Sequence, residues 1–408
     1  MNEPSKRGFA KLAQEQSFYT KEAPAKIKKN NKSLQIGIPK EASQQERRVP
    51  LKPASVGVLV QNGHEVIIES GSGDAANFSD QAYSEAGATI SYSAKEVFES
   101  NIVLKVLSPT LEEVEWMNSG SILISAFQSG RQTPRYLEAI NKKKVIAIGY
   151  EFVEDKVGGL PLVRAMSEIA GSTVMLIAAE FLSSAKNGKG VTIGGITGVP
   201  PTRVTILGAG TVAEFSARAA LGLGAEIRVF DNHIYKLRRL KHALGSEVYT
   251  STYDHTVMER EIKGTDVLIG AVRMEKGQNK ILVSEEMVAS MKKNSVIIDV
   301  SIDQGGCIET SEITTHNNPI FVKYDVIHYC VPNIASRVAR TASLAISNIV
   351  TPILLEAGEE GGFEELIYSQ PRIMKGIYSY KGSLTKLELS KRFNMPYKDI
   401  SLFMAARF

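Results

Sequence analysis

The chain of 408 residues is poor in several features that mark specialised classes of protein. Two cysteines are too few for a disulfide scaffold and lack the C-x-x-C spacing of zinc sites, so we expect a reducing compartment, the cytoplasm, and no metal site. No uninterrupted apolar run approaches the ~20 residues of a membrane span. The net charge of only +4 gives no reason to expect nucleic acid binding.

The positive charge that is present is concentrated at the N-terminus. Residues 1–33 contain eight Lys or Arg and three Glu, so the rest of the chain is close to neutral. The segment lacks the apolar core of ~7–15 residues that a secretory signal needs. We therefore predict a basic, solvated N-terminal extension over residues 1–33. An organellar transit peptide is the alternative, although three acidic residues are many for one.

Apolar strands alternate with helices in two series along the remaining chain. This alternation is typical of βαβ units with parallel sheets, so we predict an α/β protein with two domains. The first series has strands at 34–38, 64–69, 103–107, 121–125 and 144–148, with helices at 53–61 and from Ser79 to the Gly87 stop. The second follows Gly158-Gly159, with a helix at 167–184, strands at 203–207, 226–230, 267–269 and 295–300, and a helix from 336 to about 356.

The second series contains a dinucleotide-binding pattern, G-x-G-x-x-A, between a strand and a helix. Gly208 permits the tight turn, Gly210 lets the backbone approach a pyrophosphate, and Ala213 allows close helix packing. The next strand ends at Asp231, about twenty residues on, where an acid binds the ribose. An acid there repels a 2′-phosphate, so we predict NAD. Lys236, which lies nearby, keeps NADP open as an alternative.

Several runs of residues resemble the alanine dehydrogenase family, which includes the alpha subunit of nicotinamide nucleotide transhydrogenase. They are Ile36-Gly-Ile-Pro-Lys-Glu, Arg47-Arg-Val-Pro-Leu-Lys-Pro, Pro161-Leu-Val-Arg-Ala-Met-Ser-Glu-Ile-Ala-Gly, Ile302-Asp-Gln-Gly-Gly-Cys and Tyr329-Cys-Val-Pro-Asn. The resemblance implies two Rossmann-like, doubly wound domains with an interdomain cleft. Residues 34–160 plus 340–408 would form the substrate domain, and residues 161–339 the NAD-binding domain.

The resemblance also implies roles for single residues. Arg48 would bind the substrate carboxylate as a bidentate clamp. Asp303 would be catalytic, ordering the amino group and the attacking water at the carboxyl end of a strand. Ser167 would lie near the pyrophosphate, and Val272 and Asn333 near the nicotinamide.

Two positions depart from the family pattern. The acid–base histidine falls on Gln128, whose amide can bind a carbonyl but cannot exchange a proton near neutral pH. We predict that Gln128 orients the carbonyl or amine. The substrate lysine falls on Leu107. Lys105 lies two residues earlier on the same face of the strand, so we consider it a substitute that would bind substrate.

The leading interpretation is an NAD-dependent amino-acid dehydrogenase resembling alanine dehydrogenase, acting on a small amino acid or 2-oxo acid as a homo-oligomer. One alternative is imine reduction on a larger amine and oxo acid, as in saccharopine dehydrogenases. Another is a nucleotide-binding sensor, or a transhydrogenase-like subunit that needs a membrane partner. Cys307 and Cys330 are interpreted as packed thiols, because no histidine is positioned by sequence to activate them.

Overall fold

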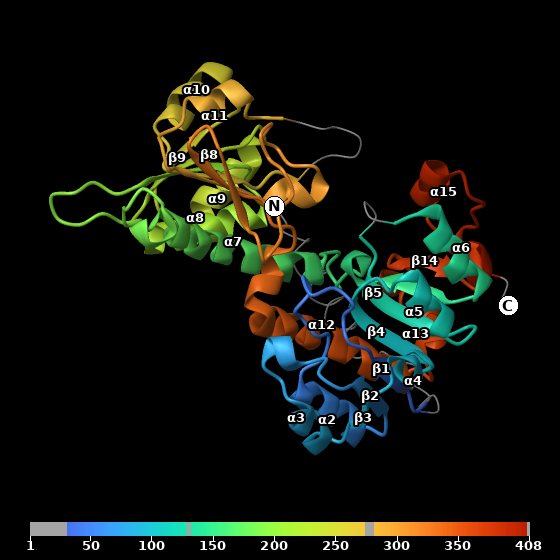
Figure 1. The fold of residues 1–408 in the computed structure, drawn as a ribbon. Helices are drawn as coiled ribbons and strands as arrows, with labels where there is room; N and C mark the ends of the chain where they lie inside the picture. Colours follow the sequence, from blue (N-terminus) through green and yellow to red (C-terminus); the bar gives the residue numbers. More distant parts are fainter. Residues whose placement is uncertain (1–30, 129–131, 274–280, 406–408) are drawn as a thin grey trace, which may run out of the picture.

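The computed structural model describes residues 31–128, 132–273 and 281–405, which build two separate sheets flanked by helices (Figure 1). The predicted α/β class is confirmed. The first sheet has the strand order β15-β14-β6-β5-β4-β1-β2-β3, and the second the order β12-β13-β11-β10-β7-β8-β9. We call the parts built on these sheets the first and second domains.

The first domain contains the five strands of the first predicted series and one short strand, Thr89–Ser91, that the sequence did not indicate. They are β1 (Gln35–Ile38), β2 (Glu65–Glu69), β3 (Thr89–Ser91), β4 (Ile102–Leu107), β5 (Ile122–Ala126) and β6 (Ile146–Gly149), all mutually parallel. The connecting helices are α2 (Pro53–Gln61), α3 (Asp80–Glu85), α4 (Ala94–Phe98), α5 (Leu111–Trp116) and α6 (Pro134–Lys142). Four of them begin at a Ser or Thr whose side chain accepts a backbone N–H of the first turn, which satisfies a donor the helix leaves open: Ser79, Ser93, Thr110 and Thr133.

The second domain contains the dinucleotide pattern. Its strands are β7 (Arg203–Leu207), β8 (Glu226–Phe230), β9 (Tyr249–Ser251), β10 (Val267–Gly270), β11 (Val296–Asp299), β12 (Ile320–Lys323) and β13 (Val326–Tyr329). All neighbours pair in parallel except β12 and β13. The helices are α8 (Thr211–Gly222), α9 (Ile234–Leu244), α10 (His255–Lys263) and α11 (Glu285–Ala289), with the short 3₁₀ segments η4 (Val300–Gln304) and η5 (Ile334–Val338).

Two long helices, α7 (Pro161–Leu182) and α12 (Ala339–Glu359), connect the domains and contact each other. In Figure 1, α7 runs from the first domain to the second. It begins six residues before the predicted start, because Pro161 occupies its first turn, where proline is tolerated. Gly171 permits close contact with α8, since a Cβ there would lie 2.4 Å from the Val212 carbonyl oxygen.

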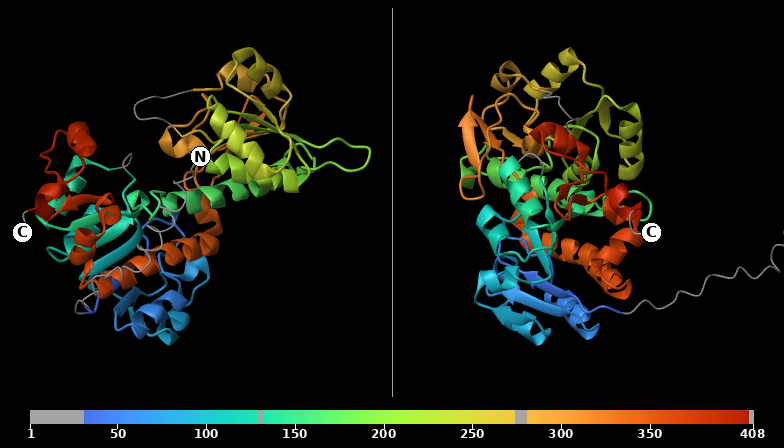
Figure 2. Two further views of the ribbon diagram at one scale, coloured as in Figure 1. Left: turned by 180° about the vertical axis from the view of Figure 1, so that it is seen from behind. Right: turned by 90° about the vertical axis from the view of Figure 1, so that its right-hand side faces the viewer.

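The end of the chain returns to the first sheet, which the sequence pattern did not show. After α13 (Phe363–Ser369) and α14 (Pro371–Met374), β14 (Ile377–Tyr380) pairs antiparallel with β6 and with β15 (Ser383–Leu384). Helices α15 (Leu387–Phe393) and α16 (Ile400–Ala405) follow. The views in Figure 2 place this red segment against the first domain. The sequence analysis predicted no strand in this region, so both β14 and β15 were missed.

Two segments, Pro161–Leu182 and Ile334–Glu359, are long and apolar enough to cross a membrane by length and composition. Helices in the core of a protein meet the same criterion, so this is weak evidence. The first contributes Val174, Ile177 and Phe181 to the core of the second domain. The second contributes Ile346, Val350 and Leu354 to the core of the first. Their apolar character is thus explained by packing.

Candidate active site

The dinucleotide turn has room for a phosphate. Gly208 has φ +99°, and a Cβ there would lie 2.5 Å from the carbonyl oxygen of Ala271, so glycine is required. Gly210 is the N-cap of α8, and nothing lies within 4 Å of the position its Cβ would take. Ala213 is fully buried in the first turn. The open space in front of a helix N-terminus fits the pyrophosphate of a dinucleotide.

Asp231, directly after β8, is fixed beside this turn. Its Oδ2 accepts the N–H of Ala209 at 2.8 Å, and its Oδ1 accepts the N–H of His233 at 2.8 Å. The His233 ring Nδ1 also lies 2.9 Å from Oδ1. The residue is only 6% exposed, and Oδ2, which accepts the Ala209 N–H, keeps capacity for a further donor. Lys236 lies half-buried in the first turn of α9. Arg239, which the sequence analysis did not single out, donates to the carbonyl of Ala209 at 3.2 Å.

Arg48 is buried and paired with Glu46, a residue that the sequence analysis missed. Its Nε lies 2.7 Å from Glu46 Oε1, and its Nη2 lies 2.6 Å from Glu46 Oε2. Burial alone would raise the pKa of Glu46, but the charge and hydrogen bonds of Arg48 bring this pKa below its usual value. The pairing occupies one edge of the guanidinium. The end formed by Nη1 and Nη2 keeps N–H donors for a carboxylate.

Asn333, which the sequence analysis places near the nicotinamide, lies next to this pair. Asn333, in the left-handed conformation at φ +61°, donates from Nδ2 to Glu46 Oε2 at 2.7 Å. Its backbone N–H lies 3.5 Å from Asp303 Oδ2. A continuous set of contacts therefore joins Arg48 to Asp303 across the two domains.

The other two predicted cofactor-binding residues, Val272 and Ser167, lie on either side of the contacts from Arg48 to Asp303. Val272 follows β10 and donates its N–H to Ser301 at 3.0 Å, in the same 3₁₀ segment as Asp303. Ser167 lies half-buried on α7, one residue after Met166, whose sulfur is 3.2 Å from Arg48 Nη1. Gly208, Asp231 and Val272 thus follow the carboxyl ends of strands of the second sheet, the edge where α/β proteins bind nucleotides. Ser167 lies on α7 beside a contact of Arg48.

Gln128 follows β5 with φ +48°. Its N–H and that of Phe127 both donate to Glu151 Oε1, at 3.0 and 2.8 Å. Burial raises the pKa of Glu151, although these hydrogen bonds lower it in part. Glu151 therefore fixes the backbone that presents Gln128 at the carboxyl end of the first sheet.

Lys105 is almost fully buried in β4 and has acidic partners. Its Nζ lies 3.0 Å from Glu113 Oε1 and 3.8 Å from Glu41 Oε2. Glu41 also accepts the N–H of Val106 at 2.7 Å and that of Leu107 at 3.4 Å. The ammonium of Lys105 is thus engaged within the domain, and its binding of substrate stays a prediction.

The fold also brings together residues that are remote in sequence. His316 donates its backbone N–H to Gln45 Oε1 at 2.7 Å, and its half-buried ring is affected electrostatically by the backbone of Asn333. No local pattern could show this, because the partners lie 271 residues apart.

Cys307 and Cys330 are free and buried, and burial raises the pKa of Cys330 to about 11. Both cysteines have the character of packed thiols.

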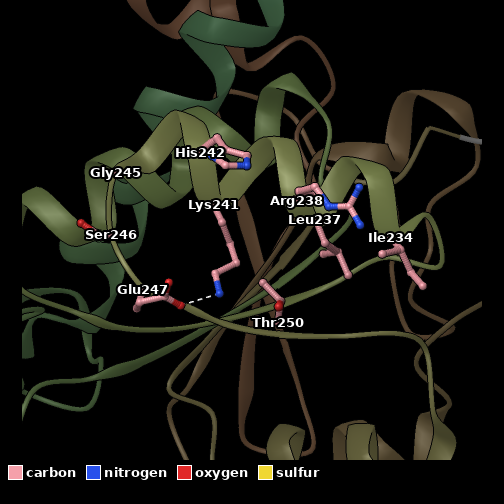
Figure 3. A pocket seen from close by; sticks show the side chains of 9 residues that line it. All are labelled: Ile234, Leu237, Arg238, Lys241, His242, Gly245, Ser246, Glu247 and Thr250. Atoms are coloured by element: carbon pink, nitrogen blue, oxygen red, sulfur yellow. Dashed lines mark ion pairs between the residues drawn. The ribbon is translucent and has the colours of Figure 1, made fainter.

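A surface hollow of about 640 Å³ lies away from these residues, along α9 and the start of β9 (Figure 3). Its lining includes Arg238, Lys241 and His242 on one side and the Lys241–Glu247 ion pair across it. Asp231 and the glycine turn do not line it. The predicted site residues described above therefore lie at the carboxyl ends of the strands and outside this hollow.

Comparisons with known proteins agree with this arrangement. Residues 37–170 match the N-terminal domain of the alanine dehydrogenase/PNT family, and residues 174–387 match its C-terminal domain. The chain is 37% identical over 368 residues to alanine dehydrogenase 2 of Staphylococcus aureus (strain USA300), covering 90% of this chain and 98% of the relative. It is 38% identical to the alanine dehydrogenase of Methanococcus maripaludis over 364 residues, covering 89% and 97%.

Solved structures show the same likeness. An L-alanine dehydrogenase structure superimposes with a TM-score of 0.83 at 36% identity, covering 88% of this chain and 99% of the other. A transhydrogenase from Sinorhizobium meliloti, at 22% identity, shares the fold with a TM-score of 0.74, covering 86% and 99%. By its sequence and its fold, the chain belongs to the alanine dehydrogenase/PNT family.

Proposed function

We propose that the chain is an NAD-dependent amino-acid dehydrogenase that interconverts L-alanine with pyruvate and ammonia. One observation carries the proposal: the contacts from Arg48 through Glu46 and Asn333 reach Asp303. These contacts connect the carboxylate-binding group of one domain with the catalytic carboxylate of the other. The relatives named alanine dehydrogenases, which match nearly their whole length, support the same substrates.

NAD would be held by the second domain, over residues 161–339. Gly208 and Gly210 give the pyrophosphate access to the N-terminus of α8, and the Asp231 carboxylate accepts hydrogen bonds from the ribose hydroxyls. Ser167, Val272 and Asn333 would line the remainder of the site. When bound, the nicotinamide accepts or donates the hydride. The substrate domain would comprise residues 34–160 and 340–408.

Arg48 would bind the carboxylate of the substrate end-on, through Nη1 and Nη2. Glu46 occupies the other edge of the guanidinium and so fixes its plane. Gln128 would orient the carbonyl or amine through its amide. Asp303 would order the amino group and the water that attacks the imine.

Imine reduction with a larger amine is a second candidate, because Leu107 places an apolar side chain where the resemblance expects a lysine. Without that charge, the site has fewer groups that hold the carbonyl of a small oxo acid. An assay with several amines in place of ammonium distinguishes the two candidates.

The test is NADH oxidation with pyruvate and ammonium, compared between the native chain and Asp303→Asn. We expect turnover by the native chain and its loss in the variant, with NADH binding retained. No turnover with any small 2-oxo acid would refute the proposal.

A further inference from the structure

The proposed roles do not use Glu41, a charged residue of the first domain whose side chain is buried. Its side chain is 8% exposed and lies just after β1. The pairing of β1 with β4 runs to Gly37 and Val103, so the end of β4 lies beyond the registered partners of β1. There the Glu41 carboxylate accepts the N–H groups of Val106 and Leu107 in place of a neighbouring strand. It therefore lies at the carboxyl end of the first sheet.

The charges around Glu41 do not balance. Lys105 approaches it to 3.8 Å but lies closer to Glu113, at 3.0 Å. Arg48 is paired with Glu46. Two cations thus face three carboxylates in a buried region, so one carboxylate needs a proton or a cationic ligand. Glu41 has the longest ion-pair distance of the three.

Glu41 faces further groups from neighbouring elements. Tyr150, after β6, donates its hydroxyl hydrogen to the carbonyl of Val106 at 2.6 Å. Its electrostatic interaction with Arg48 raises the pKa of that guanidinium. Burial and the nearby charge of Glu46 raise the pKa of Glu41 to about 7, although Lys105 and the N–H groups of Val106 and Leu107 lower it in part. A carboxyl group with this pKa both takes up and releases a proton at neutral pH.

We propose that Glu41 is the acid–base residue of the substrate site, which takes a proton from the ammonium ion and returns it to the oxygen of the 2-oxo acid. This inference rests on the proposed amino-acid dehydrogenase function. It supplies the proton exchange that the amide of Gln128 cannot perform. Leu107, whose N–H bonds to Glu41, pairs in register with Ala126, two residues before Gln128, so both groups lie at one end of the sheet.

The step conserves atoms and charge. The ammonium ion gives one proton to the Glu41 carboxylate, and the electron pair of that N–H bond stays on nitrogen. The pair then forms the bond to the 2-oxo carbon, while the π pair of the carbonyl moves to oxygen. The oxygen takes the proton back, so Glu41 is again a carboxylate and the product is the carbinolamine with its nitrogen still protonated as –NH3+, which carries the positive charge of the ammonium ion. Nothing is oxidised or reduced in this step.

His316 is another proton-exchanging side chain close to the site. Burial lowers its pKa, and the positive charges of Arg47 and Arg337 lower it further, although the backbone of Asn333 and the charge of Glu46 act in the opposite direction. Its ring is thus kept neutral on the second-domain side, beside Asn333. Glu41 lies on the side of Leu107 and Gln128, where the resemblance places the groups that contact the carbonyl.

The kinetic test compares the pH dependence of kcat/KM for ammonium in the native chain, Glu41→Gln and His316→Gln. The glutamine amide oxygen still accepts the Val106 N–H, so the sheet end is preserved. We expect Glu41→Gln to lower kcat/KM for ammonium roughly 100-fold and to flatten its change near pH 7, with the Kd of NADH unchanged. A matched control is Glu261→Gln, a buried carboxylate paired with Arg228 in the second domain. An unchanged profile in Glu41→Gln, or a profile moved only by His316→Gln, would overturn the proposal.

A second readout does not depend on turnover. Difference infrared spectra of the native chain against Glu41→Gln report whether a buried carboxyl titrates near neutral pH. We expect such a band, and we expect ammonium chloride, but not sodium chloride, to convert it to the carboxylate. If the native chain fails to oxidise NADH but shows this behaviour, the dehydrogenase proposal fails and the cation-responsive carboxyl stands. If the band is absent, the role of Glu41 is refuted even in an active enzyme.

Discussion

Asn333 and Glu46 are joined by a 2.7 Å hydrogen bond from the amide Nδ2 to the carboxylate Oε2. Glu46 also binds Arg48 through both carboxylate oxygens, and its side chain has no exposed surface. The residue that would hold the substrate carboxylate and a residue that would face the nicotinamide therefore share one buried carboxylate. A change at Glu46 is expected to disturb substrate binding without touching substrate itself.

The first prediction concerns this shared carboxylate. Glu46→Gln removes a charge-assisted partner of the Arg48 guanidinium, and such hydrogen bonds contribute about 1.5–3 kcal/mol. We expect the KM for the 2-oxo acid to rise roughly 10- to 100-fold, while the Kd of NADH changes little. Steady-state kinetics and fluorescence titration measure the two quantities. An unchanged KM would show that Arg48 needs no partner to bind the carboxylate.

Cofactor choice is expected to depend on Asp231. Asp231→Asn keeps an acceptor for the N–H of Ala209 but removes the negative charge that repels a 2′-phosphate. We expect the preference for NAD over NADP to fall roughly tenfold or more, because the variant no longer repels the 2′-phosphate of NADP electrostatically. The ratio of the two Kd values measures this. If the ratio stays the same, another group determines the choice.

Stability is expected to depend on pH through Glu41. Its pKa is raised from 4.5 to about 7 in the folded chain, so the folded state holds this proton more tightly than the unfolded state. The contribution of Glu41 to the free energy of unfolding therefore falls as pH rises from about 4.5 to about 7, by at most about 3 kcal/mol. In Glu41→Gln this decrease in the free energy of unfolding with rising pH is absent, because the glutamine amide does not titrate. Urea unfolding of both chains at about pH 5 and about pH 8 measures the difference, and parallel pH dependences would contradict it.

Gln128 and Glu41 are expected to be coupled. In the native background, Gln128→His adds a second proton-exchanging group to a site that already has one, so its gain in kcat is small. In the Glu41→Gln background, the same change restores part of the lost activity, because imidazole exchanges protons near neutral pH. Histidine also tolerates the positive φ of this position better than most residues. A double-mutant cycle on kcat gives the coupling. Purely additive effects would assign the proton exchange to neither residue.

Local sequence predicted most of the parallel strands of both domains, but not the short strands β3 and β9 or the strand β13. Strands such as Val296–Asp299 are buried on both faces, and their continuous apolar runs were recognised for this reason. The C-terminal hairpin was missed because β14 pairs with β6, more than 200 residues earlier, and is completed by only two residues of β15. A short strand that depends on a distant partner gives no periodic signal.

The candidate site also combines residues that local sequence predicts with residues whose role depends on distant parts of the chain. The glycine turn and Asp231 were predicted because their spacing along the chain fixes their geometry. Glu46 lies two residues from Arg48 and was still overlooked, since its importance comes from Asn333, 287 residues away. Glu41 carried no signal of its own, because its burial and its raised pKa are properties of the folded domain.

The most direct test of the account is NADH oxidation in the presence of pyruvate and ammonium, measured side by side for the native chain and for Asp303→Asn. The account predicts turnover that requires both co-substrates in the native chain, and its loss in the variant with the Kd of NADH retained. Absence of turnover in the native chain with pyruvate and every other small 2-oxo acid, despite tight NADH binding, would contradict it.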